Sequence, residues 1–194
     1  MTRKATVKRT TRETDVAVSI DLDGTGTADV ATGVGFFDHL LTSLAFHGMF
    51  DLEITVRGDL EIDDHHTVED TALVLGQAIA EALGDRAGIA RFGDASVPMD
   101  EALAAAAVDV GGRPYAVADL MLTTGRIGNL TTQNLPHALE ALARTSGITL
   151  HLTATGRNDH HVAEAAFKAL GRALREAVAP DPRRAAIPST KGTT

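Results

Sequence analysis

The pattern His-His-x-x-Glu occurs twice in this sequence, in "DHHTVE" and again in "DHHVAE". On a helix, residues three and four apart lie on neighbouring rows, so the histidines and the glutamate of each copy emerge together. Adjacent histidines point about 100° apart, so each pair suits two metal ions better than one. Another histidine precedes each copy on a predicted helix. The metal ligands that we predict are His39, His65, His66, Glu69, His137, His160, His161 and Glu164.

These ligands are enough for two sites, each with three imidazoles and one carboxylate. An octahedral ion held in this way keeps two positions open, which distinguishes catalytic metal sites from closed structural ones. For one copy alone, hydrogen-bonded boundary histidines and a solvated acidic helix start are the simpler interpretation. Two copies at matched positions favour metal binding. His47 either faces a ligand or caps a helix end beside Gly48, and His151 lies in a predicted strand with a structural role.

The composition is that of an ordinary globular protein. Of 194 residues, 44% are hydrophobic and 23% charged, and the net charge of -8 argues against a phosphate-neutralising surface for nucleic acid. The sequence has no cysteine, so a metal must be held by nitrogen and oxygen. No apolar run is long enough for a membrane span or a signal peptide. We therefore expect a cytoplasmic protein that binds neither nucleic acid nor membrane.

Hydrophobic periodicity predicts the elements that carry these residues. Alternation from Val16 to Leu22, a turn at "DG" and a second run to Val30 predict a hairpin. The sequence then predicts a helix over 36–48, a strand over 50–58 and a helix from His65 that ends at Gly84. In the second half it predicts strands over 103–112 and 114–122, a helix over 135–146, a strand over 148–156 and a helix over 160–178.

The two halves match residue by residue. His39 and His137 are 98 residues apart, as are Gly58 and Gly156, whereas the double histidines are 95 apart. Only the loop before the double histidine is predicted to differ, by three residues. The sequence thus predicts an α+β fold of two duplicated ββαβα halves, with helices layered on antiparallel or mixed sheets. The halves are 1–95 and 96–194, the second with a C-terminal tail, in one compact unit.

Several cationic segments are candidates for binding phosphate. "PSTKG" in the tail offers a hydroxyl, an ammonium and backbone donors, which together suit a phosphate. Each of the other segments is common in turns or on solvated faces. "GTGTAD" lacks the third glycine and the helix of a dinucleotide fingerprint. The cationic and hydroxyl residues in question are Arg91, Arg113, Lys168, Ser189 and Lys191.

The segments "FFDHL", "GDLEIDDHHTVED", "DVGGRPY", "GRNDHHVAEAAFKALGRAL" and "PSTKG" together resemble the imidazoleglycerol-phosphate dehydratase family of histidine biosynthesis. The resemblance implies a fold related to a domain of a small-subunit ribosomal protein, two manganese ions per active site, and a 24-subunit homo-oligomer with sites between subunits. It implies that the eight predicted ligands hold the metals, that Glu13 acts as acid or base, and that His47 lies on the substrate side. It assigns the phosphate to Arg91, Arg113, Lys168, Ser189 and Lys191.

The chain departs from the family's usual pattern at three places. The family commonly has serine where Gly111 or Gly112 stands and an acidic residue where Pro136 stands, and its tail is apolar where this chain ends in "KGTT". None of these changes removes a predicted ligand. Metal identity does not follow from the ligands alone, because zinc, iron, cobalt and nickel also accept imidazole and carboxylate. The choice of manganese comes from the resemblance.

The resemblance implies a hydro-lyase, which removes water from D-erythro-imidazoleglycerol phosphate to give imidazole acetol phosphate. Two alternatives stay open from the residues. One is a two-metal hydrolase of a small phosphorylated or amide substrate, although such sites typically use more shared carboxylates. The other is a non-enzymatic assembly whose subunits are held together by metal ions.

Overall fold

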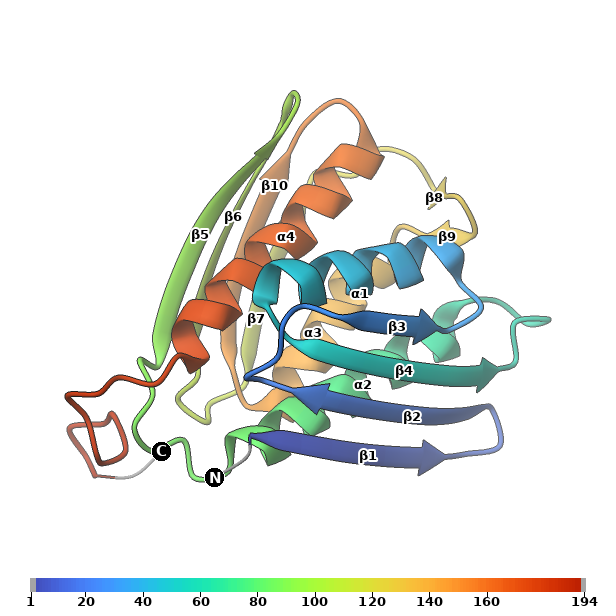
Figure 1. Cartoon of the computed structure of the whole chain (residues 1–194). Helices are drawn as coiled ribbons and strands as arrows, with labels where there is room; N and C mark the ends of the chain where they lie inside the picture. The colour runs from blue at the N-terminus through green and yellow to red at the C-terminus, as the bar shows by residue number, and fades with distance from the viewer. Residues whose placement is uncertain (1–2, 193–194) are drawn as a thin grey trace.

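The computed structural model describes residues 3–192. Two four-stranded sheets lie on the outside and four helices lie between them (Figure 1). The first sheet has the order β1-β2-β4-β3 and the second the order β5-β6-β10-β7. Helices α1 and α2 pack on the first sheet, α3 and α4 pack on the second, and the two helix layers meet as α1 with α4 and α2 with α3.

The helices are α1 (Gly35–Gly48), α2 (His65–Leu83), α3 (Asn134–Ser146) and α4 (Asp159–Val178). The strands of the first sheet are β1 (Lys4–Thr10), β2 (Thr14–Asp21), β3 (Ala28–Ala31) and β4 (Asp51–Gly58). Those of the second are β5 (Phe92–Met99), β6 (Ala102–Asp109), β7 (Tyr115–Leu120) and β10 (Thr149–Thr155). A small hairpin of β8 (Arg126–Ile127) and β9 (Leu130–Thr131) precedes α3. None of the helices within residues 3–192 is long and apolar enough to cross a membrane.

The predicted α+β fold and its four helices are confirmed, but the small hairpin of β8 and β9 and one further strand in each half were missed. The further strands are β1 and β5, so each half is βββαβα apart from that hairpin. Both are edge strands and bury little: Val7 is the buried side chain of β1, and Gly93 is the buried residue of β5. Charges on edge strands are a common protection against aggregation, and they erase the apolar alternation by which a strand is recognised.

The hairpin predicted across Asp23 and Gly24 is wrong. Strand β2 pairs with β1 and β4, and β3 pairs with β4 in parallel. The cause is the carboxylate of Asp51, which accepts the backbone N–H groups of Thr25 (2.8 Å) and Thr27 (3.0 Å). These bonds tie the loop to the start of β4, and the chain then follows the far edge of β4.

The two halves share one topology but differ by an insertion. Val18 on β2 pairs with Ile54 on β4, and Ala106 on β6 pairs with Leu152 on β10. Val18 and Ala106 therefore hold equivalent positions in the two halves, 88 residues apart in the sequence. The offset is 98 between α1 and α3 and between β4 and β10, so the second half gains ten residues between β7 and α3. At α2 and α4 the offset falls to 95. The expectation that only the loop before the double histidine differs is therefore wrong. Since the predicted boundary after residue 95 falls inside β5, we propose that the halves divide before Phe92.

Two glycines at equivalent positions allow the helix layers to approach closely. A Cβ on Gly171 of α4 would lie 2.5 Å from the carbonyl oxygen of Leu44 on α1. A Cβ on Gly76 of α2 would lie 2.1 Å from Thr145 Oγ1 and 2.6 Å from the Leu142 carbonyl oxygen on α3. Each glycine follows the first histidine of its helix by eleven residues, about three turns. The crossings that they permit bring the histidines of neighbouring helices together.

Candidate metal centre

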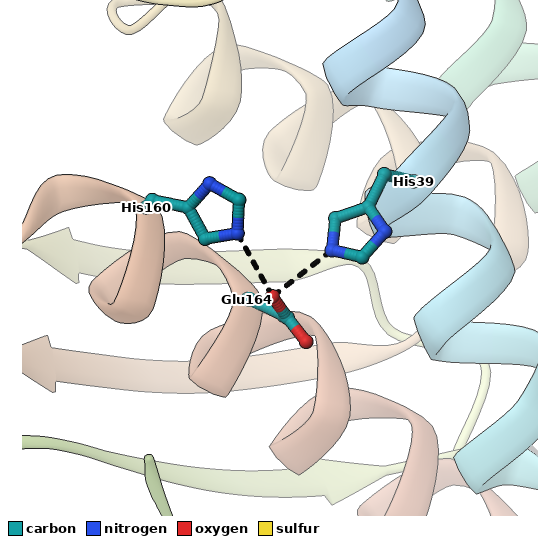
Figure 2. Close-up of side chains that lie close together, drawn as sticks. All are labelled: His39, His160 and Glu164. Atoms are coloured by element: carbon teal, nitrogen blue, oxygen red, sulfur yellow. Dashed lines mark hydrogen bonds and ion pairs between the residues drawn. The ribbon is translucent and has the colours of Figure 1, made fainter. Parts of the chain in front are cut away.

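The crossing of α1 and α4 joins His39, His160 and Glu164, which we call the α1–α4 cluster (Figure 2). Glu164 Oε2 lies 2.9 Å from His39 Nε2 and 3.1 Å from His160 Nε2. Figure 2 shows both rings pointing at this one carboxylate from different helices. His160 and Glu164 are one turn apart on α4, so their spacing follows from the helix, while His39 arrives only through the crossing.

The crossing of α2 and α3 joins His65, Glu69 and His137, which we call the α2–α3 cluster. Glu69 Oε2 lies 3.6 Å from His65 Nε2, and Glu69 Oε1 lies 3.3 Å from His137 Nε2. The two imidazole rings stack with centroids 5.0 Å apart. Within the described part of the chain, His137 Nε2 is buried and makes no hydrogen bond. Such an orphaned nitrogen is costly unless a ligand satisfies it.

Cations already surround both carboxylates. Lys168 Nζ lies 2.7 Å from Glu164 Oε1, one turn along α4. Burial alone would raise the pKa of Glu164, but hydrogen bonds from His39 and Lys168 and the charge of Lys168 outweigh burial and lower this pKa to about 2. On the other cluster, Arg144 of α3 lies 3.4 Å from Glu69 Oε1. Each glutamate is thus paired with one cationic side chain as well as with the histidines of its cluster.

The second histidine of each pair lies outside its cluster. His66 Nδ1 donates to Asp59 (2.9 Å), and His161 Nδ1 donates to Glu101 (2.9 Å). These hydrogen bonds raise the pKa of both histidines, and the bond from His161 lowers the pKa of Glu101 to about 2. Within one chain, therefore, two imidazoles and one carboxylate meet at each cluster, rather than three imidazoles and one carboxylate.

The hydrogen bonds of these histidines select the ring nitrogen that is offered to a metal. A carboxylate that accepts from Nδ1 leaves Nε2 as the free donor for a metal, an arrangement common among metal-binding histidines. His65 has a similar support, because its Nδ1 lies 3.2 Å from the amide oxygen of Asn134. Sequence reasoning missed the supporting residues Asp59, Glu101 and Asn134, since none of them lies on the helix of the histidine that it contacts.

Glu13 and His47 lie in different parts of the site, Glu13 beside His66 and His47 beside the α1–α4 cluster. Glu13 is 55% exposed in its side chain, and its Oε1 lies 3.9 Å from His66 Nε2. His47 lies near the end of α1, where burial and the charges of Lys168 and Arg172 lower its pKa. Lys168 therefore lies beside the α1–α4 cluster together with His47, and apart from the other predicted phosphate ligands.

Those other ligands gather at the opposite end of α4. Arg91 donates to both oxygens of Asp109 (2.7 and 3.1 Å) and to the carbonyl oxygen of Pro188 (2.7 Å), which brings the tail with Ser189 and Lys191 to it. Arg113 Nη2 lies 3.9 Å from Asp109. The Arg91 amide donates to Ala177, which is 17 residues after His160 on the same helix, or about 25 Å along its axis. Within one chain, these residues do not reach the metal clusters.

The donor atoms fit a divalent cation. In each cluster, two histidine nitrogens and a carboxylate oxygen lie within 4.8 Å of one another, and the buried His137 nitrogen has no other partner among residues 3–192. A cation between them would satisfy that nitrogen and offset the charge of the carboxylate. Nitrogen and oxygen ligands without thiolate suit first-row divalent metals.

Comparison with known proteins shows the family. The model of the family "Imidazoleglycerol-phosphate dehydratase" matches residues 32–174. The chain is 55% identical to a protein of that name from Dinoroseobacter shibae, over 98% of this chain and 99% of the relative. It is 57% identical to another from Acidiphilium cryptum, over 99% of both.

Two solved structures of this family resemble the fold closely. The Staphylococcus aureus imidazoleglycerol-phosphate dehydratase is 35% identical, with a TM-score of 0.83, over 92% of this chain and 99% of that one. A Pyrococcus furiosus structure is 37% identical, with a TM-score of 0.83, over 97% of this chain and 100% of that one. Since the family model and both relatives match most of its length, the chain belongs to the imidazoleglycerol-phosphate dehydratase family, whose members are hydro-lyases of histidine biosynthesis.

Proposed function

We propose that this protein removes water from D-erythro-imidazoleglycerol phosphate to give imidazole acetol phosphate, with two manganese ions per active site. The observation that carries the proposal is the pair of equivalent imidazole and carboxylate clusters on His-His-x-x-Glu helices, in a chain of this family. The cations would hold the ring nitrogens of the substrate and stabilise the charge that develops as the C–H and C–O bonds break.

The residues that would hold the metals fall into two kinds. The α1–α4 and α2–α3 clusters each supply two imidazoles and a carboxylate. His66 and His161 offer Nε2 from outside the clusters, each with its Nδ1 held by a carboxylate. Three imidazoles and a carboxylate per ion are reached if each of these two histidines completes a cluster of another copy of the chain. This assignment supports a site between subunits.

Glu13 is the residue that we propose for the proton transfers. Dehydration removes a proton from the middle carbon of the glycerol chain and the hydroxyl from the carbon bonded to the ring, and the resulting enol regains a proton as it becomes the ketone. Glu13 is exposed, and its Oε1 lies 3.9 Å from His66 Nε2, the nitrogen that His66 offers to a metal. An exposed carboxylate at this place suits the exchange of protons with the substrate.

The phosphate would be held by Arg91, Arg113, Ser189 and Lys191. Because these residues lie about 25 Å along α4 from the histidines of the same chain, a complete site needs a second copy of the chain. Lys168 and His47, which lie beside the α1–α4 cluster, would contact the substrate from the metal side. This separation favours a homo-oligomer, and the 24-mer implied by the family is the assembly that we propose.

The test is an assay of the manganese-loaded protein with imidazoleglycerol phosphate. The expected result is the ketone product with no free phosphate. Release of inorganic phosphate would instead identify a hydrolase. No turnover, combined with a particle size that depends on metal, would identify a metal-stapled assembly and overturn the proposal.

A further inference from the structure

The ten-residue insertion of the second half lies against the starts of both double-histidine helices. It lies within the connection from β7 to α3, residues 121–133, which includes the β8–β9 hairpin (Figure 1), and we call this whole segment the insertion. We propose that it is a positioning element which holds the first turns of α2 and α4 in place, with Asp64 and Asp159 as its two anchor points. The inference rests on the proposed metal sites. It assigns a role in metal binding to residues that touch neither the metal nor the substrate.

The anchor on α4 is the carboxylate of Asp159, the residue directly before His160. Its Oδ2 accepts the backbone N–H groups of Thr123 (2.9 Å) and Thr124 (2.6 Å) and the hydroxyl of Thr124 (2.6 Å). Asp159 is only 6% exposed, so these hydrogen bonds replace water around a charged group. A buried carboxylate with such donors holds its partners firmly.

The anchor on α2 is Asp64, the residue directly before His65. It accepts the backbone N–H of Thr131 (2.7 Å) and the hydroxyl of the same residue (2.6 Å), and it is 4% exposed. An aspartate at a helix start usually caps its own helix. Among the described residues, Asp64 makes no such capping bond and turns to the insertion instead.

The insertion connects the two anchors by its own hydrogen bonds. The Thr132 hydroxyl donates to the Thr124 carbonyl oxygen (2.6 Å), and the Thr132 amide donates to the Gly125 carbonyl oxygen (3.1 Å). Leu130 is fully buried beside them. Asn134, which follows the insertion, contacts His65 Nδ1. A continuous set of bonds thus runs from the residue before His160 to the residue before His65.

This arrangement has a consequence for the metal sites. A metal ligand must lie within about 0.2 Å of its ideal distance, and the first turn is the least supported part of a helix. The first half has no comparable insertion of its own, so its double histidine depends on the insertion of the second half. Loosening either anchor would widen the range of positions of His65 or His160 and weaken the metal site.

The experiment measures the manganese affinity of variants that each lack one hydroxyl. The metal-free protein is titrated with manganese, and electron paramagnetic resonance distinguishes the free from the bound ion. Thr131→Val and Thr124→Val each remove one hydroxyl that donates to an anchor, and we expect about tenfold weaker binding. Thr131→Ser and Thr124→Ser keep the hydroxyl and should restore affinity. Thr25→Val is the matched control, because its hydroxyl also donates to an aspartate, Asp51, at the far end of the first sheet.

A second measurement keeps the inference separate from the proposed function. Hydrogen exchange of the metal-free protein should be several-fold faster in the first turns of α2 and α4 in the matching valine variants, and unchanged in Thr25→Val. Wild-type protein that binds no manganese would refute the proposed function, and the exchange data would still decide the inference. The inference would be overturned if the Thr131→Val and Thr124→Val variants bind metal and exchange like wild type. It would also be overturned if Thr25→Val loses as much manganese affinity as they do.

Discussion

Substitution of Gly171 by alanine should separate the two helices that form the α1–α4 cluster. The added Cβ would lie 2.5 Å from the carbonyl oxygen of Leu44 and 3.1 Å from the amide nitrogen of Gly48. Both neighbours are backbone atoms of α1, so neither can rotate away. The helices must therefore move apart by about half an ångström or more, since packed protein interiors leave no spare room for the extra carbon.

The size of the effect follows from two opposing contributions. Overpacking costs about 1–3 kcal/mol, and the backbone contact on Gly171 places this site at the upper end. Alanine regains about 1 kcal/mol because it favours the helix over glycine. The net loss of about 2 kcal/mol should lower the melting temperature by about 4–8 °C for a domain of this size. Gly76→Ala should behave alike, because its Cβ meets α3 at equally short distances.

The assay is thermal unfolding of the metal-free protein at one fixed concentration, followed by manganese titration. Gly125→Ala is the matched control for the melting temperature, because a Cβ at that position meets nothing within 4 Å, and the wild type is the reference for metal binding. We expect weaker metal binding along with the lower melting temperature, since His39 on α1 moves away from His160 and Glu164. If Gly171→Ala melts within about 1 °C of Gly125→Ala, a shift worth under about 0.5 kcal/mol, the helix crossing is not under the constraint that we describe.

Three further predictions concern carboxylates. Glu101→Ala should weaken manganese binding by about 10–100-fold, because His161 loses the partner that fixes its tautomer, and unchanged affinity would show that His161 is not a ligand. Glu13→Gln should abolish turnover while metal content stays near that of wild type; loss of metal would mean that Glu13 is a ligand. The pKa of Glu164 is lowered from 4.5 to about 2, so its ionised form stabilises the metal-free fold above pH 4.5, and that stability is lost as the pH falls toward 2. Glu164→Gln should therefore show a flatter fall in unfolding free energy over this range, and an equally steep fall would contradict the assignment.

The sequence alone was sufficient for features that depend on local spacing. Four helices and the pairing of His65 with Glu69 and of His160 with Glu164 follow from the period of the α-helix, and the duplication follows from residues that match at a fixed offset. The repeated "DHH" also contained a signal that was not used, because Asp64 and Asp159 hold equivalent positions before the two double histidines. Their partners in the insertion were not visible, since those contacts join residues 35 to 67 positions apart.

Only the tertiary structure decided which long-range neighbours meet. Edge strands β1 and β5 pair through backbone groups, so their side chains carry little record of the pairing. The crossings at Gly76 and Gly171 bring His137 and His39 to the helices that carry the double histidines, and they leave His66 and His161 outside the two clusters. The same geometry places Arg91 about 25 Å from the metal clusters of its own chain. Helical periodicity is a property of neighbouring residues and can be read from the chain, whereas these distances depend on how whole elements pack, which no local pattern records.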